Sequence, residues 1–205
     1  MALLNEQEQR QVAEAIAQVE RRTDAELVTV LAARADDYGY APLLWAGLLA
    51  LLVPGAMNFY PGWLSAQELL LAQWATFIGF GLLLRLPALA PRLVPRTLRH
   101  WRAANLARRQ FLAQNLHHTE GATGMLIFVS EAERYVEILV DRGIASRLPD
   151  ATWQALVDAF TDQVKRGQTL QGFLDCIQGC GALLEQHLPA THARNELPNH
   201  LVILP

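Results

Sequence analysis

Two apolar runs in the middle of the chain constrain its fold more than any other feature. Residues 38–67 form a stretch of 30 residues without a charged side chain, and residues 69–84 form a second run of 16 residues. A membrane-spanning helix needs about 20 residues, at about 1.5 Å each. The sequence therefore predicts a transmembrane helical hairpin over residues 41–90, with spans at about 41–60 and 66–86.

The segment that joins the two runs supports a hairpin. It contains Pro61 and Gly62, which favour a turn, and Tyr60 and Trp63, which suit a membrane–water interface. A link this short makes the two helices antiparallel. The alternative is a buried helical hairpin in a soluble protein, but two adjacent runs of this length rarely fit inside a domain of about this size.

The arginines predict the orientation of the hairpin. The connecting turn carries none, whereas Arg34 precedes the first span and Arg85 follows the second. Between Glu68 and Glu120 no acidic residue occurs, and the arginines there are Arg85, Arg92, Arg96, Arg99, Arg102, Arg108 and Arg109. The positive-inside rule places both termini in the cytoplasm. We therefore expect a multi-pass protein of the bacterial inner (plasma) membrane, inserted without a cleavable signal peptide.

A basic helix is predicted directly after the hairpin. Pro91 and Pro95 interrupt the chain, and a helix begins near Thr97. On one interpretation this segment contacts anionic lipid; on the other it is a soluble-domain helix with solvated arginines. The candidate lipid-contacting residues are Arg92, Arg96, Arg99, Arg102 and Trp101. Topology already explains these charges, so we expect no nucleic-acid partner.

The remaining residues predict one soluble domain that the hairpin divides into residues 1–36 and 95–205. Periodic apolar positions predict helices over 6–22, 151–165 and 170–187, and β-rich runs predict strands over 25–33, 124–130 and 135–141. A lone strand before the hairpin is not stable, so its partners must follow the hairpin. The fold class is α/β (α+β-like), with a small mixed sheet flanked by helices.

Several motifs in this order resemble the TPM domain family, in particular its bacterial membrane branch. They are Thr-Asp-Ala-Glu-Leu-Val-Thr-Val at 23–30, Gly-Met-Leu-Ile-Phe-Val-Ser-Glu-Ala-Glu-Arg-Tyr-Val-Glu-Ile at 124–138, Asp-Arg-Gly-Ile at 141–144, Pro-Asp at 149–150 and Asn-Glu-Leu-Pro at 195–198. The resemblance implies a TPM-type fold. It also implies links to calcium binding, to weak acid phosphatase activity and to the assembly or repair of membrane complexes.

The resemblance supplies a candidate cation site. Asp150 and Glu26 match acidic positions of the family, and Asp141 lies at the other end of the loop that leads to Asp150. Oxygen ligands suit Ca²⁺, which takes about 6–8 of them. Three positions depart from the family pattern: Asp141 replaces a glycine, Ile144 replaces a leucine and Ala145 replaces a glutamate. The alternative is that Asp150 is a helix cap and Asp141 pairs with an arginine.

No set of catalytic residues accompanies this candidate site. The sequence has no cysteine–arginine loop, glycine-rich phosphate cradle or catalytic-triad spacing. Cys176 and Cys180 share a helix face, where a buried structural role is favoured over a zinc site with His187. The preferred hypothesis is a binding or assembly module without chemistry of its own, with a membrane protein complex as a possible partner. The alternatives are a weak metal-dependent phosphohydrolase and an anionic-lipid sensor.

Overall fold

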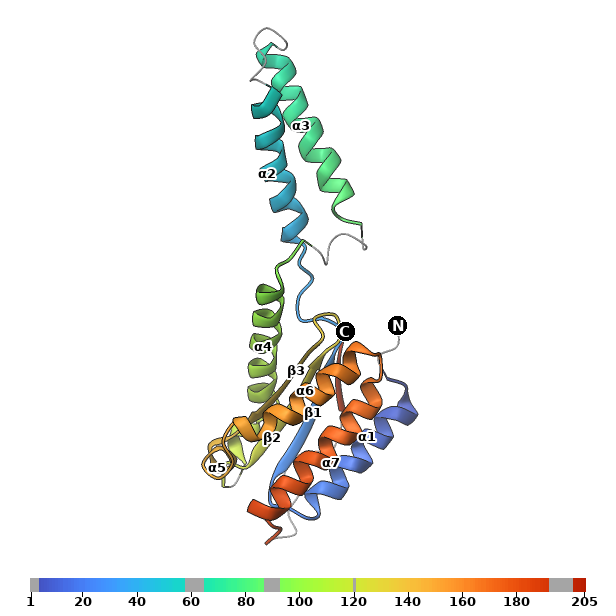
Figure 1. Cartoon of the computed structure of the whole chain (residues 1–205), viewed down its shortest axis with the longest axis vertical. Coiled ribbons are helices and arrows are strands. Elements are labelled where there is room, and N and C mark those ends of the chain that lie inside the picture. The colour runs from blue at the N-terminus through green and yellow to red at the C-terminus, as the bar shows by residue number, and fades with distance from the viewer. Residues whose placement is uncertain (1–3, 58–64, 87–92, 120, 192–200) are drawn as a thin grey trace. The chain divides into compact units, whose positions relative to one another are not determined.

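The computed structural model describes residues 4–57, 65–86, 93–119, 121–191 and 201–205, and it divides the chain into two compact units. The first unit comprises residues 1–35 and 100–205, and the second comprises residues 36–99. The first unit holds a mixed sheet with helices on both faces (Figure 1). The second holds two helices, α2 (Tyr40–Met57) and α3 (Ala66–Leu83).

The sheet joins strands from both sides of the inserted helices. Its order is β3-β2-β1-β4, with β1 at Glu26–Ala32, β2 at Gly124–Ser130, β3 at Tyr135–Val140 and β4 at Leu201–Leu204. Strand β1 pairs in parallel with β2 and with β4, whereas β2 and β3 form an antiparallel pair. The expectation that the strand before the hairpin finds its partners after it is confirmed.

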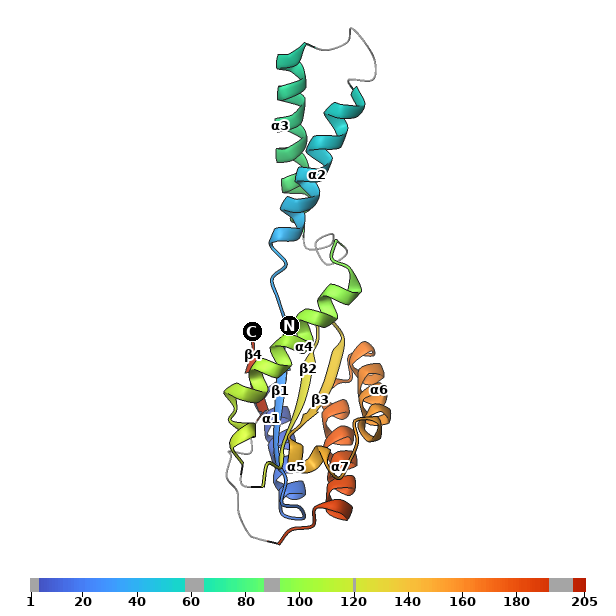
Figure 2. The ribbon, with the colours of Figure 1, turned by 90° about the vertical axis from the view of Figure 1, so that its left-hand side faces the viewer.

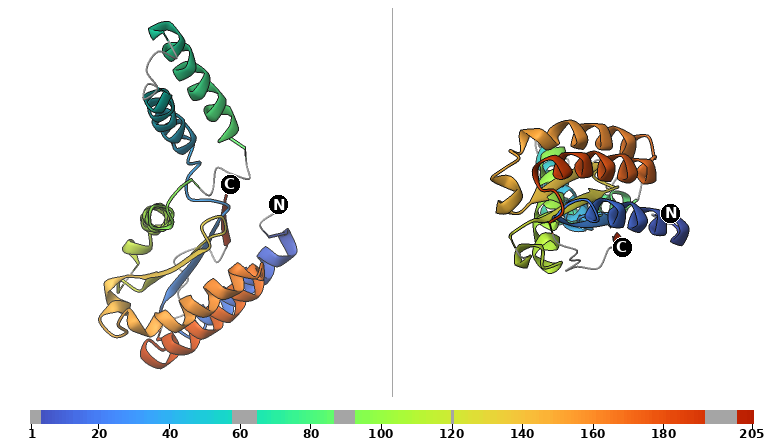
Figure 3. Two further views of the ribbon diagram at one scale, coloured as in Figure 1. Left: turned by 45° about the horizontal axis from the view of Figure 1, so that its top comes forward. Right: turned by 90° about the horizontal axis from the view of Figure 1, so that it is seen from below.

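Helices cover the two faces of this sheet unequally. Helices α1 (Glu6–Glu20), α6 (Ala151–Lys165) and α7 (Thr169–His187) lie on one face, and α4 (Arg96–Ala113) lies on the other (Figures 2 and 3). Alternate residues of a strand point to opposite faces, so the two central strands need apolar residues throughout. All seven residues of β1 and all seven of β2 are buried.

The core on the three-helix face is the larger of the two. Phe160 of α6 and Phe173 of α7 meet there edge to face, with ring centroids 4.9 Å apart. Cys176 and Cys180 are buried in the same core as free thiols, and adding a Cβ to the nearby Gly172 would bring it within 2.2 Å of the Phe160 ring. The two cysteines therefore serve helix packing, as favoured above, and His187 is exposed.

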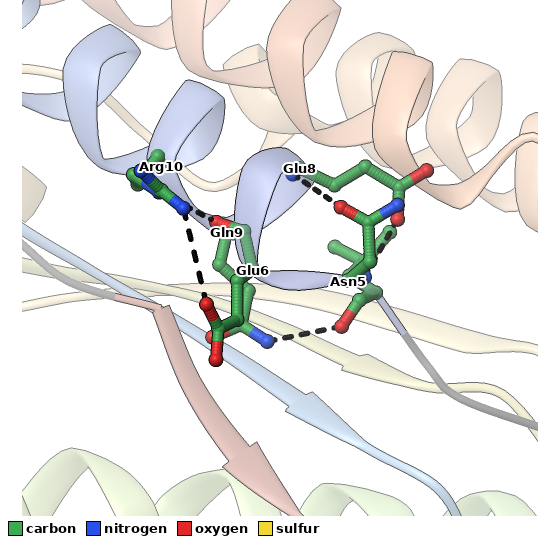
Figure 4. A network of polar contacts seen from close by, with 6 residues as sticks. Asn5, Glu6, Glu8, Gln9 and Arg10 are labelled. Carbon is green, nitrogen blue, oxygen red and sulfur yellow. Dashed lines mark hydrogen bonds and ion pairs between the residues drawn. The ribbon is translucent and has the colours of Figure 1, made fainter.

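Local capping signals locate the start of two helices. Before α1, Asn5 and Glu8 form a reciprocal capping box: the Asn5 side chain accepts from the Glu8 N–H at 2.9 Å, and the Asn5 N–H donates to Glu8 at 2.7 Å (Figure 4). Ser65 and Glu68 form the same arrangement before α3. These contacts satisfy N–H groups that a helix N-terminus otherwise leaves unpaired.

One local expectation needs correction, and two short elements are not predicted from the sequence. Asp150 does not cap α6: its backbone is already helical (φ −52°, ψ −34°) and its side chain makes no capping hydrogen bond. The chain between β3 and α6 contains a short helix, α5 (Arg142–Ala145), which the sequence does not signal. Residues Leu201–Leu204, for which no strand is predicted above, form strand β4.

Candidate functional site

The helices α2 and α3 present apolar side chains outward. Both are long and apolar enough to cross a membrane. No residue of α3 is buried, and Leu71 is 68% exposed. Among the described side chains of α2, the buried ones are Ala41, Pro42, Ala46 and Ala50, and a Cβ at Gly81 of α3 would lie 3.9 Å from the Ala46 side chain. Small residues thus form the contact between the helices, and large apolar residues face outward.

A hollow of about 570 Å³ lies between α2 and α3. Apolar side chains line most of it, together with one amide: Leu44, Gly47, Leu48, Ala50, Leu51, Leu70, Gln73, Trp74 and Phe77. Such a surface has no polar array that could recognise a water-soluble substrate. Its composition suits hydrocarbon chains.

Helix α4 has two chemically different faces. Ala103 and Ala107 are fully buried against the sheet. Trp101 and Leu112 lie on the opposite face of the helix, because they are displaced from the two alanines by about half a turn; each is 56% exposed. The Arg102 guanidinium lies 5.3 Å from the centre of the Trp101 ring. The outer face therefore combines an exposed aromatic ring with cationic side chains.

Three of the four predicted lipid-contacting arginines lie in α4. Arg96 is exposed at the first residue of α4, and Arg99 and Arg102 are partly buried in the same helix. Arg92 lies outside the described residues. Lipid contact at these positions stays a prediction.

The three predicted cation ligands lie at two structural positions. Glu26 begins β1 and is paired with Gly124 of β2, and the Asp141 N–H donates to the carbonyl of the same Gly124 at 2.9 Å. Glu26 and Asp141 therefore flank the start of β2. Asp150 is exposed at the start of α6 and lines a groove beside β3.

Two of these carboxylates, Glu26 and Asp141, have partners within the domain. Glu26 is only 5% exposed, and the residue takes part in a polar or electrostatic interaction within the domain. One carboxylate oxygen of Asp141 accepts the Arg142 N–H at 2.7 Å and so caps α5, in place of the expected pairing with an arginine side chain. Among the described residues, no group of three or more His, Cys, Asp or Glu side chains is placed to hold a metal ion. The calcium and phosphatase hypotheses stay predictions.

A second polar cluster lies on the α4 side of β3. The His100 and Tyr135 rings are 5.3 Å apart. Tyr135 and Glu137 share a hydrogen bond between their side chains, and the Arg108 charge acts on both. Burial raises the pKa of Glu137 above its ordinary value of 4.5, although the Tyr135 hydroxyl and Arg108 oppose that shift. Burial also raises the pKa of Tyr135, and the neighbouring Glu137 carboxylate adds to the effect.

This cluster borders a groove of about 580 Å³ that follows the edge of the sheet. Strand β3 forms its floor, and α6 contributes Trp153, Val157 and Thr161. The other lining residues include Arg134, in the turn between β2 and β3, and Asp150. Sequence reasoning missed this groove. The only sequence pattern that relates to the groove is the apolar–polar alternation of β3, and that pattern does not show that β3 is an edge strand.

Comparison with known proteins identifies the domain. Residues 93–183 match the model of the TPM domain family. The chain carries a TPM domain. The match begins after the inserted helices and ends inside α7. In this chain the sheet of the TPM domain also includes β1 and β4, which lie outside the matched residues.

A solved structure has the same fold. The solution structure of the BA42 protein from the psychrophilic bacterium Bizionia argentinensis is similar to this chain, with a TM-score of 0.59 and 18% sequence identity, over 98% of this chain and 94% of that chain. At this identity the likeness concerns the fold alone. No curated protein sequence matches the chain.

Proposed function

We propose that this protein is anchored in the bacterial inner membrane by the α2–α3 hairpin and uses its TPM domain, on the cytoplasmic side, to bind a partner. The observation that carries the proposal is the exposure of large apolar side chains along both helices, including 66% for Leu51 and 66% for Leu82. In water such a surface is unfavourable by about 25 cal/mol per Å² of apolar area, whereas hydrocarbon solvates it.

The distribution of arginine supports the orientation. The segment between α2 and α3 contains no arginine, whereas Arg34 lies before α2 and Arg85 lies just after α3. Basic residues near the ends of a span favour the cytoplasmic side. Both parts of the TPM domain are thus assigned to the cytoplasm.

A binding role suits the domain better than catalysis. Its carboxylates are used for structure: Asp141 caps α5, and Glu26 is buried at the start of a central strand. An open groove with polar and apolar lining lies beside the edge strand β3. Partner binding, with a membrane protein complex as the expected partner, is the function that these features support.

The outer face of α4 favours a second role, contact with anionic lipid. Trp101 is 56% exposed beside Arg102, and only 12 residues, 84–95, separate α3 from α4 in the chain. Tryptophan and arginine together suit the headgroup region, where each basic residue contributes about 1 kcal/mol.

The test begins with the full chain in cells. After alkaline carbonate extraction, the protein should stay in the membrane pellet, and crosslinking before solubilisation should recover a defined partner with it. A protein released by carbonate would contradict the anchor, and a monomer without crosslinked partners would contradict the binding role. For the lipid role, reconstituted protein should bind anionic vesicles more tightly than neutral vesicles, and equal binding would contradict it.

A further inference from the structure

The edge of β3 offers a row of unused backbone hydrogen-bonding groups. The Asp141 N–H donates to Gly124 at 2.9 Å, so Asp141 faces β2. Because residues of an antiparallel pair alternate between facing the neighbour and facing away, the N–H and C=O groups of Val136, Ile138 and Val140 point away from β2. Among the described residues, no strand pairs with this edge.

Two buried side-chain atoms beside the same edge lack partners. Trp153 is only 3% exposed and lines the groove, yet its indole Nε1–H has no acceptor among the described residues. Glu137 also lines the groove, and its Oε2 is buried without a donor. Leaving a buried polar group unpaired costs about 1–3 kcal/mol, so a ligand that supplies both an acceptor and a donor is favoured.

The charges along the groove differ from end to end. Arg134 lies exposed immediately before the first residue of β3, with a left-handed backbone (φ 51°) that belongs to the turn. Asp150 immediately precedes α6. Helix α6 begins beside α5, at the end of β3 that lies opposite Arg134 (Figure 1). The groove is thus cationic at its Arg134 end and anionic at its Asp150 end.

We propose that this groove binds an extended segment of the partner polypeptide, which pairs with β3 as a fifth strand and places a carboxylate beside Arg134. A peptide backbone supplies the alternating donors and acceptors that the β3 edge requires, and the side chains of the peptide lie on the two faces of the sheet beside Glu137 and Trp153. Six strand residues span about 20 Å, so the groove accommodates a segment of similar length. The inference rests on the proposed binding role and specifies where the partner docks.

The test uses the full chain in lipid nanodiscs and a phage library of random seven-residue peptides. Ile138→Pro removes an outward N–H without removing a hydrogen bond to β2, and Ile138→Val is its matched control. Arg134→Glu reverses the charge at one end. Selected peptides should contain Asp or Glu and should bind the wild type and Ile138→Val about tenfold more tightly than Ile138→Pro or Arg134→Glu.

Amide hydrogen exchange provides an independent readout. The bound peptide should slow exchange of the amides of Val136, Ile138 and Val140, whereas amides that face β2 are protected with or without it. Failure to select any peptide, equal binding to Arg134→Glu, or exchange at these three amides that the peptide leaves unchanged would overturn the proposal. If Ile138→Pro does not fold, Arg134→Glu and the exchange measurement decide. Carbonate extraction is scored separately, so loss of the membrane anchor is distinguishable from loss of the peptide site.

Discussion

Replacing Ile78 with arginine separates a lipid-exposed helix from a water-exposed one. Ile78 is 55% exposed in α3. At about 1.5 Å per residue, it lies about 5 Å from the midpoint of that helix, well inside a hydrocarbon layer about 30 Å thick. Arginine near the centre of a span costs about 2.5–3.5 kcal/mol, and the lost isoleucine contributed about 0.3–0.6 kcal/mol. Ile78→Arg should therefore disfavour insertion by about 3–4 kcal/mol.

Leu112 provides a matched control because it is 56% exposed, in α4 of the other unit. An exposed substitution in water changes stability by no more than about 0.5 kcal/mol. The assay is the fraction of newly made protein that stays in the membrane pellet after carbonate extraction. Ile78→Arg should lower that fraction sharply, and Leu112→Arg should leave it near the wild-type value. Equal fractions for the two variants would refute lipid exposure of α3.

Three further predictions concern the TPM domain. Gly143→Ala should destabilise it by about 1–3 kcal/mol in chemical unfolding, because the new Cβ would lie 2.2 Å from a backbone carbonyl oxygen, whereas Gly39→Ala, with no atom within 4 Å, should be nearly neutral. Because burial raises the pKa of Glu137, its contribution to stability is present below its ordinary pKa of 4.5 and is lost as pH rises through its folded-state pKa. Glu137→Gln should reduce this loss in melting curves taken at and above pH 4.5. A parallel pH dependence of the melting temperature in the two proteins would contradict this. A thiol reagent should modify Cys176 and Cys180 only after unfolding, because both are buried, and rapid labelling of the native protein would contradict their packing role.

Local patterns predicted most elements of this fold because their signals are contained in short segments. The Asn5 and Ser65 capping boxes, the apolar spans and the alternating strands each depend on residues near one another. Strand β4 depends instead on pairing with β1, more than 160 residues earlier in the chain, so its four apolar residues carry no local strand signal. Helix α5 is too short for periodicity to reveal.

The candidate site was less predictable than the fold. Asp150 has the residue type of a helix cap, but its own backbone has helical angles and its side chain makes no capping hydrogen bond. Glu26 and Asp141 lie on either side of Gly124, because Glu26 pairs with Gly124 and the Asp141 N–H donates to the Gly124 carbonyl. Only the register of the sheet shows this. The groove arises because β3 is an edge strand packed by α6, a tertiary feature that an alternating sequence does not encode.

Site-specific cysteine labelling in intact cells tests the membrane anchor most directly. Gly62→Cys places a thiol in the segment between the two spans, and Gln186→Cys places one at an exposed position of α7. The native thiols are buried and should give little background. A membrane-impermeant maleimide that reaches the periplasm should label Gly62→Cys in intact cells and should label Gln186→Cys only after the cells are lysed. Labelling of both positions from outside, or of neither before lysis, would contradict a hairpin that spans the membrane with its TPM domain in the cytoplasm.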